Sequence, residues 1–308
     1  AIQVLESAVR LAQQFINHRQ HAVRVPALDH LEAQAHLTCV PQQRDRARKP
    51  GHLRRDLPDL LLGGDRVVVG LLEVLPRHAV VDLLELMQGS TLALLPRPSV
   101  QDPYAFRCIP QVHGTSAEVI ASLGRVLEIE ADSVTDNPLV DHRSGRVMSG
   151  GNFHGQVLSM AMDHAALALA EWGSISERRT YQLISGTRGL PPFLSGQSGL
   201  ESGFMIPQYT AAALVSHNKQ LATPCVVDSI PSSNGQEDHV SMGANAANRL
   251  ATMLDNLFQI LAVEWLTANR ALSFRQGEPG FKLLQILEPY RSKVRMPDGD
   301  AYLSPLLA

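Results

Sequence analysis

The stretch VLSMAMDHAALALAEWGSIS, residues 157–176, decides the fold class of this chain. It is rich in Ala, Leu and Met with a helical apolar rhythm, and it predicts one long helix over 154–176. Residues 112–130, 209–221 and 240–271 show the same pattern, and the last is long enough to indicate a helix packed in a bundle. No series of strands supports an α/β sheet. We therefore expect an all-α fold, a bundle of long helices.

The N-terminal third differs in character from the rest, and the boundary falls near Ser99. From 22 to 98 the chain is dense in Arg, Leu, Pro, His and Asp, and its periodicity is weak. The basic run at 44–55 is read as a solvated loop, because neither aromatic residues nor a recognised motif accompany it. The sequence therefore predicts an irregular, unassigned segment, 1–98, followed by a helical part, 99–308.

Composition excludes several classes of protein. The net charge of the 308 residues is −3, and Lys and Arg are not concentrated as a nucleic-acid binder would require. Three cysteines, Cys39, Cys108 and Cys225, are too few and too scattered for a disulfide framework or a zinc knuckle, so we expect buried thiols in a reducing compartment. The longest apolar runs fall far short of the roughly 20 residues that a membrane helix needs. We expect a cytoplasmic protein with no nucleic-acid or membrane partner.

The segment QDPYAFR, residues 101–107, is the first candidate site. Asp102 followed by Pro103 is typical of a helix start, so Gln101, Tyr104 and Arg107, each three residues apart, would lie near one face. An arginine there can hold a carboxylate through two parallel hydrogen bonds, and a phenol can relay a proton. On spacing alone, a capped helix with a surface arginine is the more common structure.

Three loops carry further candidates. Asn137 stands in a turn signal, and Phe153 follows two glycines that permit close backbone approach. Gln236 and Glu237 open the run QEDH at 236–239, just before a long predicted helix. Neighbouring residues do not converge on one ion and no HExxH spacing is present, so a metal site is not expected. No GxSxG motif is present either, which excludes a serine hydrolase of that type.

Taken in order, these segments resemble the aromatic amino acid ammonia-lyase family, in its histidine ammonia-lyase form. The resemblance covers 99–275, with a weaker tail through Tyr302. NGQEDHVSMG is the discriminating stretch, since phenylalanine lyases tend to carry an amide where Glu237 stands. The blocks that carry the resemblance are VQDPYAFRCIPQVHGT, EIEADSVTDNPLV, SGGNFHGQ, SERR, LPPFLS, SGFMIPQYTAAALVSHNK and VDSIPSSNGQEDHVSMG.

The resemblance implies elimination of ammonia from L-histidine to give trans-urocanate, a reaction of histidine catabolism. It also implies a homotetramer with no external cofactor, whose electrophile is a methylidene-imidazolone ring formed from an internal Ala-Ser-Gly. By position, Tyr104 would lie beside the electrophile and Arg107 would bind the substrate carboxylate, with Asn137 and Gln101 near both. Phe153 would pack against the ring system. Glu237 would contact the imidazole, and Gln236 beside it is counted with the substrate-binding residues.

The chain departs from the family pattern in its N-terminal part. No Ala-Ser-Gly occurs in the 308 residues, and the nearest tripeptides are Ile184-Ser185-Gly186 and Met148-Ser149-Gly150. Residues 22–98 do not look like the family's central helices. Arginine far outnumbers lysine in the chain, as expected of a GC-rich coding sequence read out of frame, so 1–98 is interpreted as a frame-shifted or foreign leader. The first residue is also not Met. We therefore expect the C-terminal half of a lyase, a fragment that is inactive alone.

Two other functions stay open at this point, and a separate binding module in residues 1–98 is a third possibility. A phenylalanine or tyrosine ammonia-lyase, or an aminomutase, shares most of the same blocks. A non-catalytic helical partner of a full-length lyase belongs to a different class, and co-purification without activity would favour it.

Overall fold

The structure is a computed structural model, and it describes residues 84–92, 100–297 and 299–306. Most of the predicted leader, residues 1–83, lies outside the described residues. Residues 84–92 contact the chain at the start of the C-terminal helix α9 (Phe281–Arg291). Thr91 donates its N–H to the Glu278 carbonyl at 3.1 Å, and Phe281 donates to the Gln88 carbonyl at 3.2 Å. This part of the N-terminal segment therefore packs on the C-terminal region.

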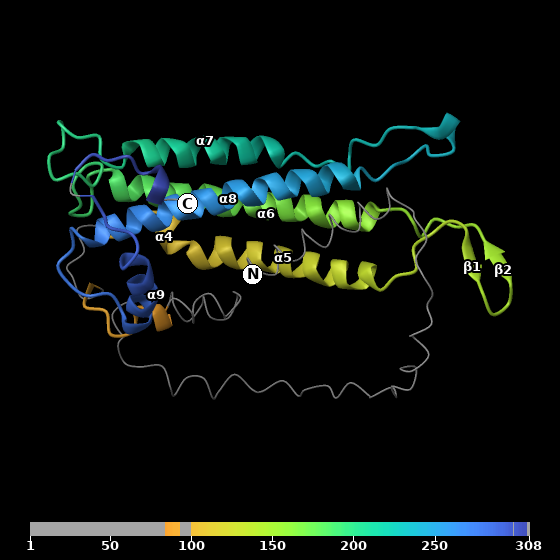
Figure 1. The fold of residues 1–308 in the computed structure, drawn as a ribbon, viewed down its shortest axis with the longest axis horizontal. Coiled ribbons are helices and arrows are strands. Elements are labelled where there is room, and N and C mark those ends of the chain that lie inside the picture. Colours follow the sequence, from red (N-terminus) through yellow and green to blue (C-terminus); the bar gives the residue numbers. More distant parts are fainter. Residues whose placement is uncertain (1–83, 93–99, 298, 307–308) are drawn as a thin grey trace.

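Four long helices make up the bundle, which confirms the all-α prediction. They are α5 (Ile109–Ala131), α6 (Gln156–Ile184), α7 (Met205–Leu221) and α8 (Gly243–Leu272). Figure 1 shows α6 and α8 side by side, with α7 along one side of the pair and α5 along the other. Among the described residues, no helix combines the length and the apolar character that crossing a membrane requires.

The end of α6 differs from the prediction. The apolar rhythm weakens after Ser176, where the sequence turns charged, yet the helix continues to Ile184. Glu177 and Arg179 lie inside the bundle and are buried there, since other helices supply their partners. Charge at these positions therefore marks a buried polar contact rather than the end of the helix.

Two hydrophobic clusters hold the helices together. The larger one lies between α5, α6 and α8, and Ala165 and Ala166 on α6 are completely buried in it because small side chains let neighbouring helices approach closely. The smaller cluster joins the end of α6 to the α6–α7 loop and to α8 through Ile184, Leu190 and Leu266. The second cluster gives that loop a fixed base.

The loop after α5 contains a small hairpin that the sequence did not predict. Strands β1 (Leu139–Asp141) and β2 (Arg146–Met148) pair antiparallel. The turn is closed by the Asp141 side chain, which accepts hydrogen bonds from the Arg143 N–H at 3.0 Å and the Ser144 hydroxyl at 2.5 Å. Strands this short leave the class all-α.

Two short helices lie at the opposite end of the bundle from the hairpin, α4 (Tyr104–Arg107) and α9 (Phe281–Arg291) (Figure 1). The sequence predicted Asp102 as the cap of α4, and this is wrong. Pro103 occupies the cap position, where no side-chain hydrogen bond caps the helix. The Asp102 carboxylate instead pairs with Arg188, and α4 packs on α5 and α6.

Candidate functional site

Tyr104 and Arg107 form an exposed pair on the outer side of α4. The Tyr104 side chain is 68% exposed. The Arg107 guanidinium carbon lies 4.3 Å from the centre of the Tyr104 ring, a cation–π contact that keeps the two groups together. Gln101 is also exposed and lies three residues before the helix. A cation next to a phenol on an open surface can bind a carboxylate and pass a proton.

Asn137 lies beyond the other end of α5. Its side-chain carbonyl oxygen accepts hydrogen bonds from the Ser149 hydroxyl and the Gly150 N–H, both at 3.1 Å. These two bonds fix the amide plane. Neither bond uses the amide nitrogen, which is a donor.

Phe153 and Glu237 lie on two loops that are joined to each other. Nε2 of His154 is 2.8 Å from the His239 carbonyl oxygen, and because a carbonyl only accepts, this nitrogen carries the proton. The two imidazole rings stack at 5.9 Å with an angle of 9° between their planes. The Phe153 side chain is 43% exposed. The loop of Phe153 and the loop of Glu237 are therefore linked through His154 and His239.

Glu237 is an exposed, anionic group. Its carboxylate accepts a hydrogen bond from the Ser232 hydroxyl at 2.6 Å, and its backbone pairs with that of Ser232 in both directions. Hydrogen bonds from Ser232 and then Ser233 hold the pKa of the Glu237 carboxyl below its usual value. The group is therefore ionised at neutral pH and able to accept from an imidazole N–H. Gln236 is exposed beside it.

The two sets of predicted site residues lie at opposite ends of the bundle. Gln101, Tyr104 and Arg107 precede α5, whereas Asn137 follows it, and 23 helical residues between them span about 35 Å. Figure 1 shows α4 near one end and the β1–β2 hairpin beyond the other. One copy of the chain therefore does not gather these groups around one point, and its described residues do not enclose a methylidene-imidazolone ring.

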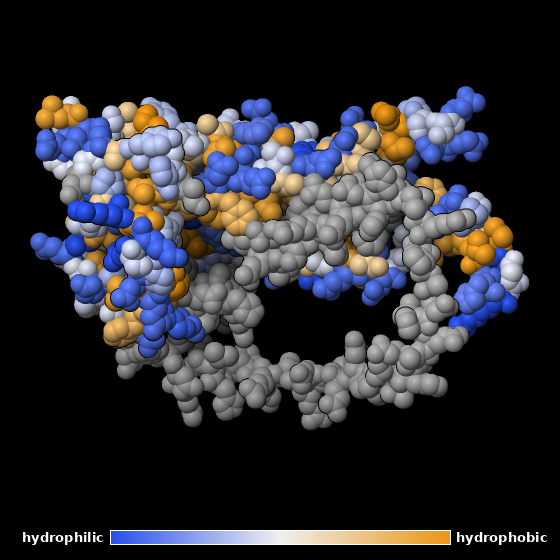
Figure 2. Space-filling model, in the orientation of Figure 1, coloured by the Kyte–Doolittle hydropathy of each residue, from blue (hydrophilic) through white to orange (hydrophobic). Residues whose placement is uncertain are grey.

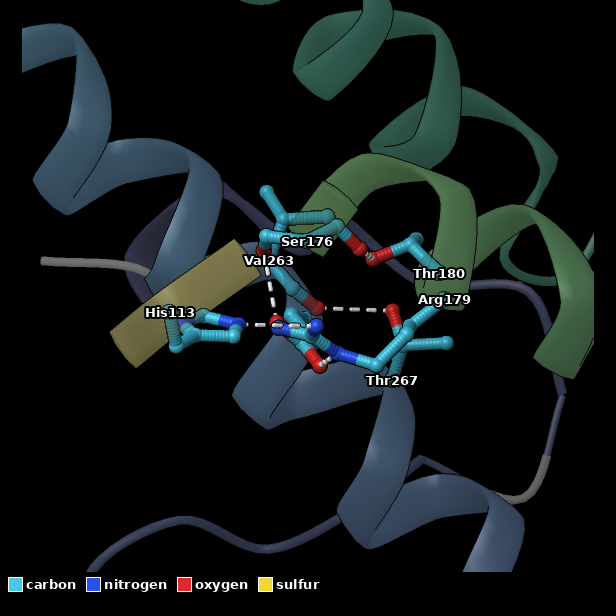
Figure 3. Close-up of polar contacts among 7 residues, drawn as sticks. His113, Ser176, Arg179, Thr180, Val263 and Thr267 are labelled. Atoms are coloured by element: carbon cyan, nitrogen blue, oxygen red, sulfur yellow. Dashed lines mark hydrogen bonds and ion pairs between the residues drawn. The ribbon is translucent and has the colours of Figure 1, made fainter. Parts of the chain in front are cut away.

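A buried polar network crosses the bundle near α4 (Figure 3). The Arg179 guanidinium, only 9% exposed, binds the Glu264 carboxylate through Nε and Nη2, and Glu264 also accepts from the Ser176 hydroxyl at 2.6 Å. Nη1 of Arg179 donates to Nε2 of His113 at 3.1 Å. Burial, and next the charge of Arg179, lower the pKa of His113 to about 4. His113 is thus neutral at pH 7, and three helices are joined through one arginine.

A sequence profile described as aromatic amino acid lyase matches residues 77–292. The chain belongs to the aromatic amino acid lyase family. The match begins upstream of the boundary near Ser99 that the change in composition suggested. It covers all four long helices, and it includes the segment 84–92 that packs before α9.

Relatives of this lyase-family chain are about half identical to it over the residues that align. Histidine ammonia-lyase of Treponema denticola is 48% identical over 218 residues, 69% of this chain and 43% of that protein. The enzyme of the same name from Deinococcus radiodurans is 48% identical over 228 residues, 73% of this chain and 44% of that protein. The chain therefore spans less than half the length of these relatives.

Solved structures agree on the fold. Histidine ammonia-lyase from Trypanosoma cruzi superimposes with a TM-score of 0.65 at 41% identity, over 67% of this chain and 41% of its own. A phenylalanine aminomutase from Pantoea agglomerans also reaches 0.65, at 29% identity, over 78% of this chain and 48% of its own. The helical bundle is thus the family fold.

Several residues of this lyase-family chain near the candidate groups had no predicted role. Arg179 stands in the block SERR that helped to indicate the family, and a charged residue three positions after Ser176 on an apolar helix was a usable signal of a buried polar contact. Glu264 interrupts the apolar pattern of α8 in the same way. Arg188 gave no such signal, because it lies in a loop, where a charged residue interrupts no apolar pattern.

Proposed function

We propose that this chain takes part in the elimination of ammonia from L-histidine to give trans-urocanate, a step of histidine degradation. Two bacterial relatives named histidine ammonia-lyase, each 48% identical, support this proposal. The observation that carries it is a pair of exposed, oppositely charged groups, Arg107 and the ionised Glu237. A histidine substrate presents the complementary groups, a carboxylate at one end and an imidazole at the other.

The groups on α4 act on the amino-acid end of the substrate in this proposal. Arg107 binds the carboxylate in a bidentate contact, and the ring of Tyr104 holds the guanidinium in place at 4.3 Å. The Tyr104 hydroxyl passes a proton during release of ammonia. Gln101 adds an amide near the same carboxylate, and Asn137 donates from its amide nitrogen.

The groups on the two joined loops act on the imidazole end. Glu237 accepts a hydrogen bond from the imidazole N–H, since its carboxylate is held ionised by Ser232. Phe153 packs on the ring system, and Gln236 contributes a polar contact. The stacked histidines His154 and His239 link the loop of Phe153 to the loop of Glu237.

Assembly is required in this proposal, because the groups for the two ends of the substrate lie at opposite ends of the bundle. We propose a homotetramer in which α4 of one copy meets the Phe153 and Glu237 loops of another. Exposed apolar side chains on the hairpin, Val140, Val147 and Met148, support a covered surface there, and Figure 2 shows hydrophobic residues at that end of the molecule.

The electrophile is the part that this chain does not contain. No external cofactor is proposed. The methylidene-imidazolone group would supply an electron acceptor, and because the 308 residues hold no Ala-Ser-Gly, it would come from sequence outside them. We propose a cytoplasmic setting for the assembly, and a lyase part that starts near residue 99.

Complementation between chains tests the proposal. The chain is mixed with a full-length histidine ammonia-lyase inactivated at its own arginine that matches Arg107, and urocanate is followed by its absorbance. We expect no product from the chain alone with L-histidine, and restored product in the mixture. The control is the same chain carrying Arg107→Gln, which should restore nothing. Equal restoration by both chains, or product from the chain alone, would contradict the shared site.

A second candidate function is a phenylalanine or tyrosine lyase or an aminomutase, favoured by the likeness to the Pantoea agglomerans enzyme. The same mixture separates the two. With Glu237→Gln, restored turnover of L-histidine should fall while turnover of L-phenylalanine should not. If the native chain restores turnover of L-phenylalanine alone, the second candidate replaces the first.

A further inference from the structure

Arg188, in the loop between α6 and α7, contacts the inner side of the segment that contains α4. Its Nη2 lies 2.8 Å from the Asp102 carboxylate, and its guanidinium carbon lies 4.8 Å from the centre of the Phe106 ring. Asp102 and Phe106 are four residues apart, so they lie on one side of this segment. Tyr104 and Arg107 are exposed. One arginine thus contacts the segment on the side away from its proposed functional pair.

The backbone of Arg188 is in a conformation that an arginine rarely adopts. Its φ is 60°, and that of Gly189 is 69°, in a turn closed by the Leu190 N–H to the Thr187 carbonyl at 3.1 Å. Turns with two positive φ values favour Gly and Asn, because a Cβ is crowded there. Within the part of the chain that the structure describes, Nη1 of Arg188 is buried and has no hydrogen-bond partner. Both features lower stability.

The turn that carries Arg188 has a rigid base. Leu190 is buried in the smaller hydrophobic cluster, next to Ile184 at the end of α6. Phe193 donates its N–H to the Ile184 carbonyl at 2.8 Å, which closes the loop on the helix. A strained residue on a rigid base holds its side chain in one direction, and such strain is typical of functional positions.

α4 needs such support. It has only four residues and no side-chain cap, so its own hydrogen bonds give it little stability. We infer that Arg188 is a positioning residue: it fixes the orientation of α4 and thereby presents Tyr104 and Arg107 to the substrate. The functional part of this inference rests on the proposed roles of those two residues. The mechanical part stands on the contacts of Arg188 alone.

Thiol labelling tests the mechanical part on the full chain. Cys108 directly follows α4, and Cys225 lies in the α7–α8 loop, so peptide mass spectrometry can read local opening at each. Arg188→Gly removes the contacts of the arginine with Asp102 and Phe106, and it leaves a residue that adopts a φ of 60° without strain. We expect labelling of Cys108 to become about tenfold faster, the change that loss of one charged hydrogen bond produces, with Cys225 unchanged.

Two further variants make the result decisive. Asp102→Ala removes the carboxylate that Arg188 binds without touching the turn, and it should accelerate labelling of Cys108 in the same way. Arg143→Gly, in the exposed hairpin turn at the far end, is the matched control and should change neither cysteine. The inference is overturned if labelling of Cys108 accelerates in neither the Arg188 variant nor the Asp102 variant. It is also overturned if labelling of both cysteines accelerates equally.

Ligand binding tests the functional part. L-histidine and histamine differ in the carboxylate, so their affinities for the native chain and for Arg188→Gly are compared by calorimetry. We expect affinity for L-histidine to fall about tenfold and that for histamine to stay constant, since only the carboxylate uses Arg107. An equal fall for both ligands overturns the positioning role. If the native chain binds neither, the proposed function has failed, and the labelling still decides whether Arg188 holds α4.

Discussion

Replacing His113 with glutamine should remove a large part of the acid sensitivity of the bundle. The imidazole is neutral in the folded chain because burial and the charge of Arg179 lower its pKa from 6.5 to about 4. Glutamine does not titrate, and its side-chain oxygen can accept from the Arg179 N–H as Nε2 of the histidine does. The substitution therefore isolates the titration from the contact.

The direction of the pH effect on the unfolding free energy follows from the lowered pKa of His113. Protons bind the unfolded chain more tightly than the folded one, so the stabilising contribution of neutral His113 is complete above pH 6.5. It is lost as pH falls from 6.5 to 4. The full shift corresponds to about 3 kcal/mol, and because the ring is not fully buried we expect about 2 kcal/mol.

Urea unfolding at several pH values between 7 and 4 measures this contribution. Unfolding free energies of the native chain and of His113→Gln should converge or cross as pH falls, with the native chain losing about 2 kcal/mol more. Carboxylates that titrate in the same range cancel in the difference. His142→Gln, on the exposed hairpin turn, is the control and should follow the native curve. Parallel curves for native chain and His113→Gln would refute the reasoning.

Two further predictions concern the carboxylates of Glu264 and Glu237, each of which has a hydrogen-bond partner in the structure. Glu264→Gln should lower the unfolding free energy by about 3 kcal/mol, because the Arg179 guanidinium is left buried without its counter-charge; urea unfolding measures this, with exposed Glu128→Gln as the neutral control. Ser232→Ala should raise the pKa of Glu237 toward its usual value, because the largest stabilising hydrogen bond is removed. Carboxyl-carbon NMR measures that pKa, and an unchanged titration would contradict the assigned cause.

Periodicity predicted the helices well because each one buries a continuous apolar stripe. The predicted helix boundaries were less accurate where charged residues interrupt the apolar stripe. Helix α6 continues past Ser176 because Arg179 meets its counter-charge on α8, and a partner on another helix is invisible to a local pattern. The hairpin at 139–148 escaped prediction because each strand has three residues, too few to show an alternation. The boundary near Ser99 stays a prediction.

The sequence identified the candidate residues by their chemical type, but it did not reveal how they are arranged in space. Spacing could group Tyr104 with Arg107, since they lie on one short helix. It could not reveal that Asp102 pairs with Arg188, because that contact depends on a positive φ in a distant turn. The separation of Arg107 from Asn137 was available in principle, since the helix predicted between them is long.

Folding and the proposed substrate binding use different side chains in this chain. The bundle is held by the clusters around α6 and by the Arg179 network, whereas Tyr104, Arg107 and Glu237 are exposed and contribute little burial. Substitutions at these three positions should therefore change the unfolding free energy by no more than about 0.5 kcal/mol. A chain built this way keeps its fold whether or not its site is complete. A folded bundle is consequently no measure of activity, and only a ligand or a complementing lyase chain can report on the groups at its two ends.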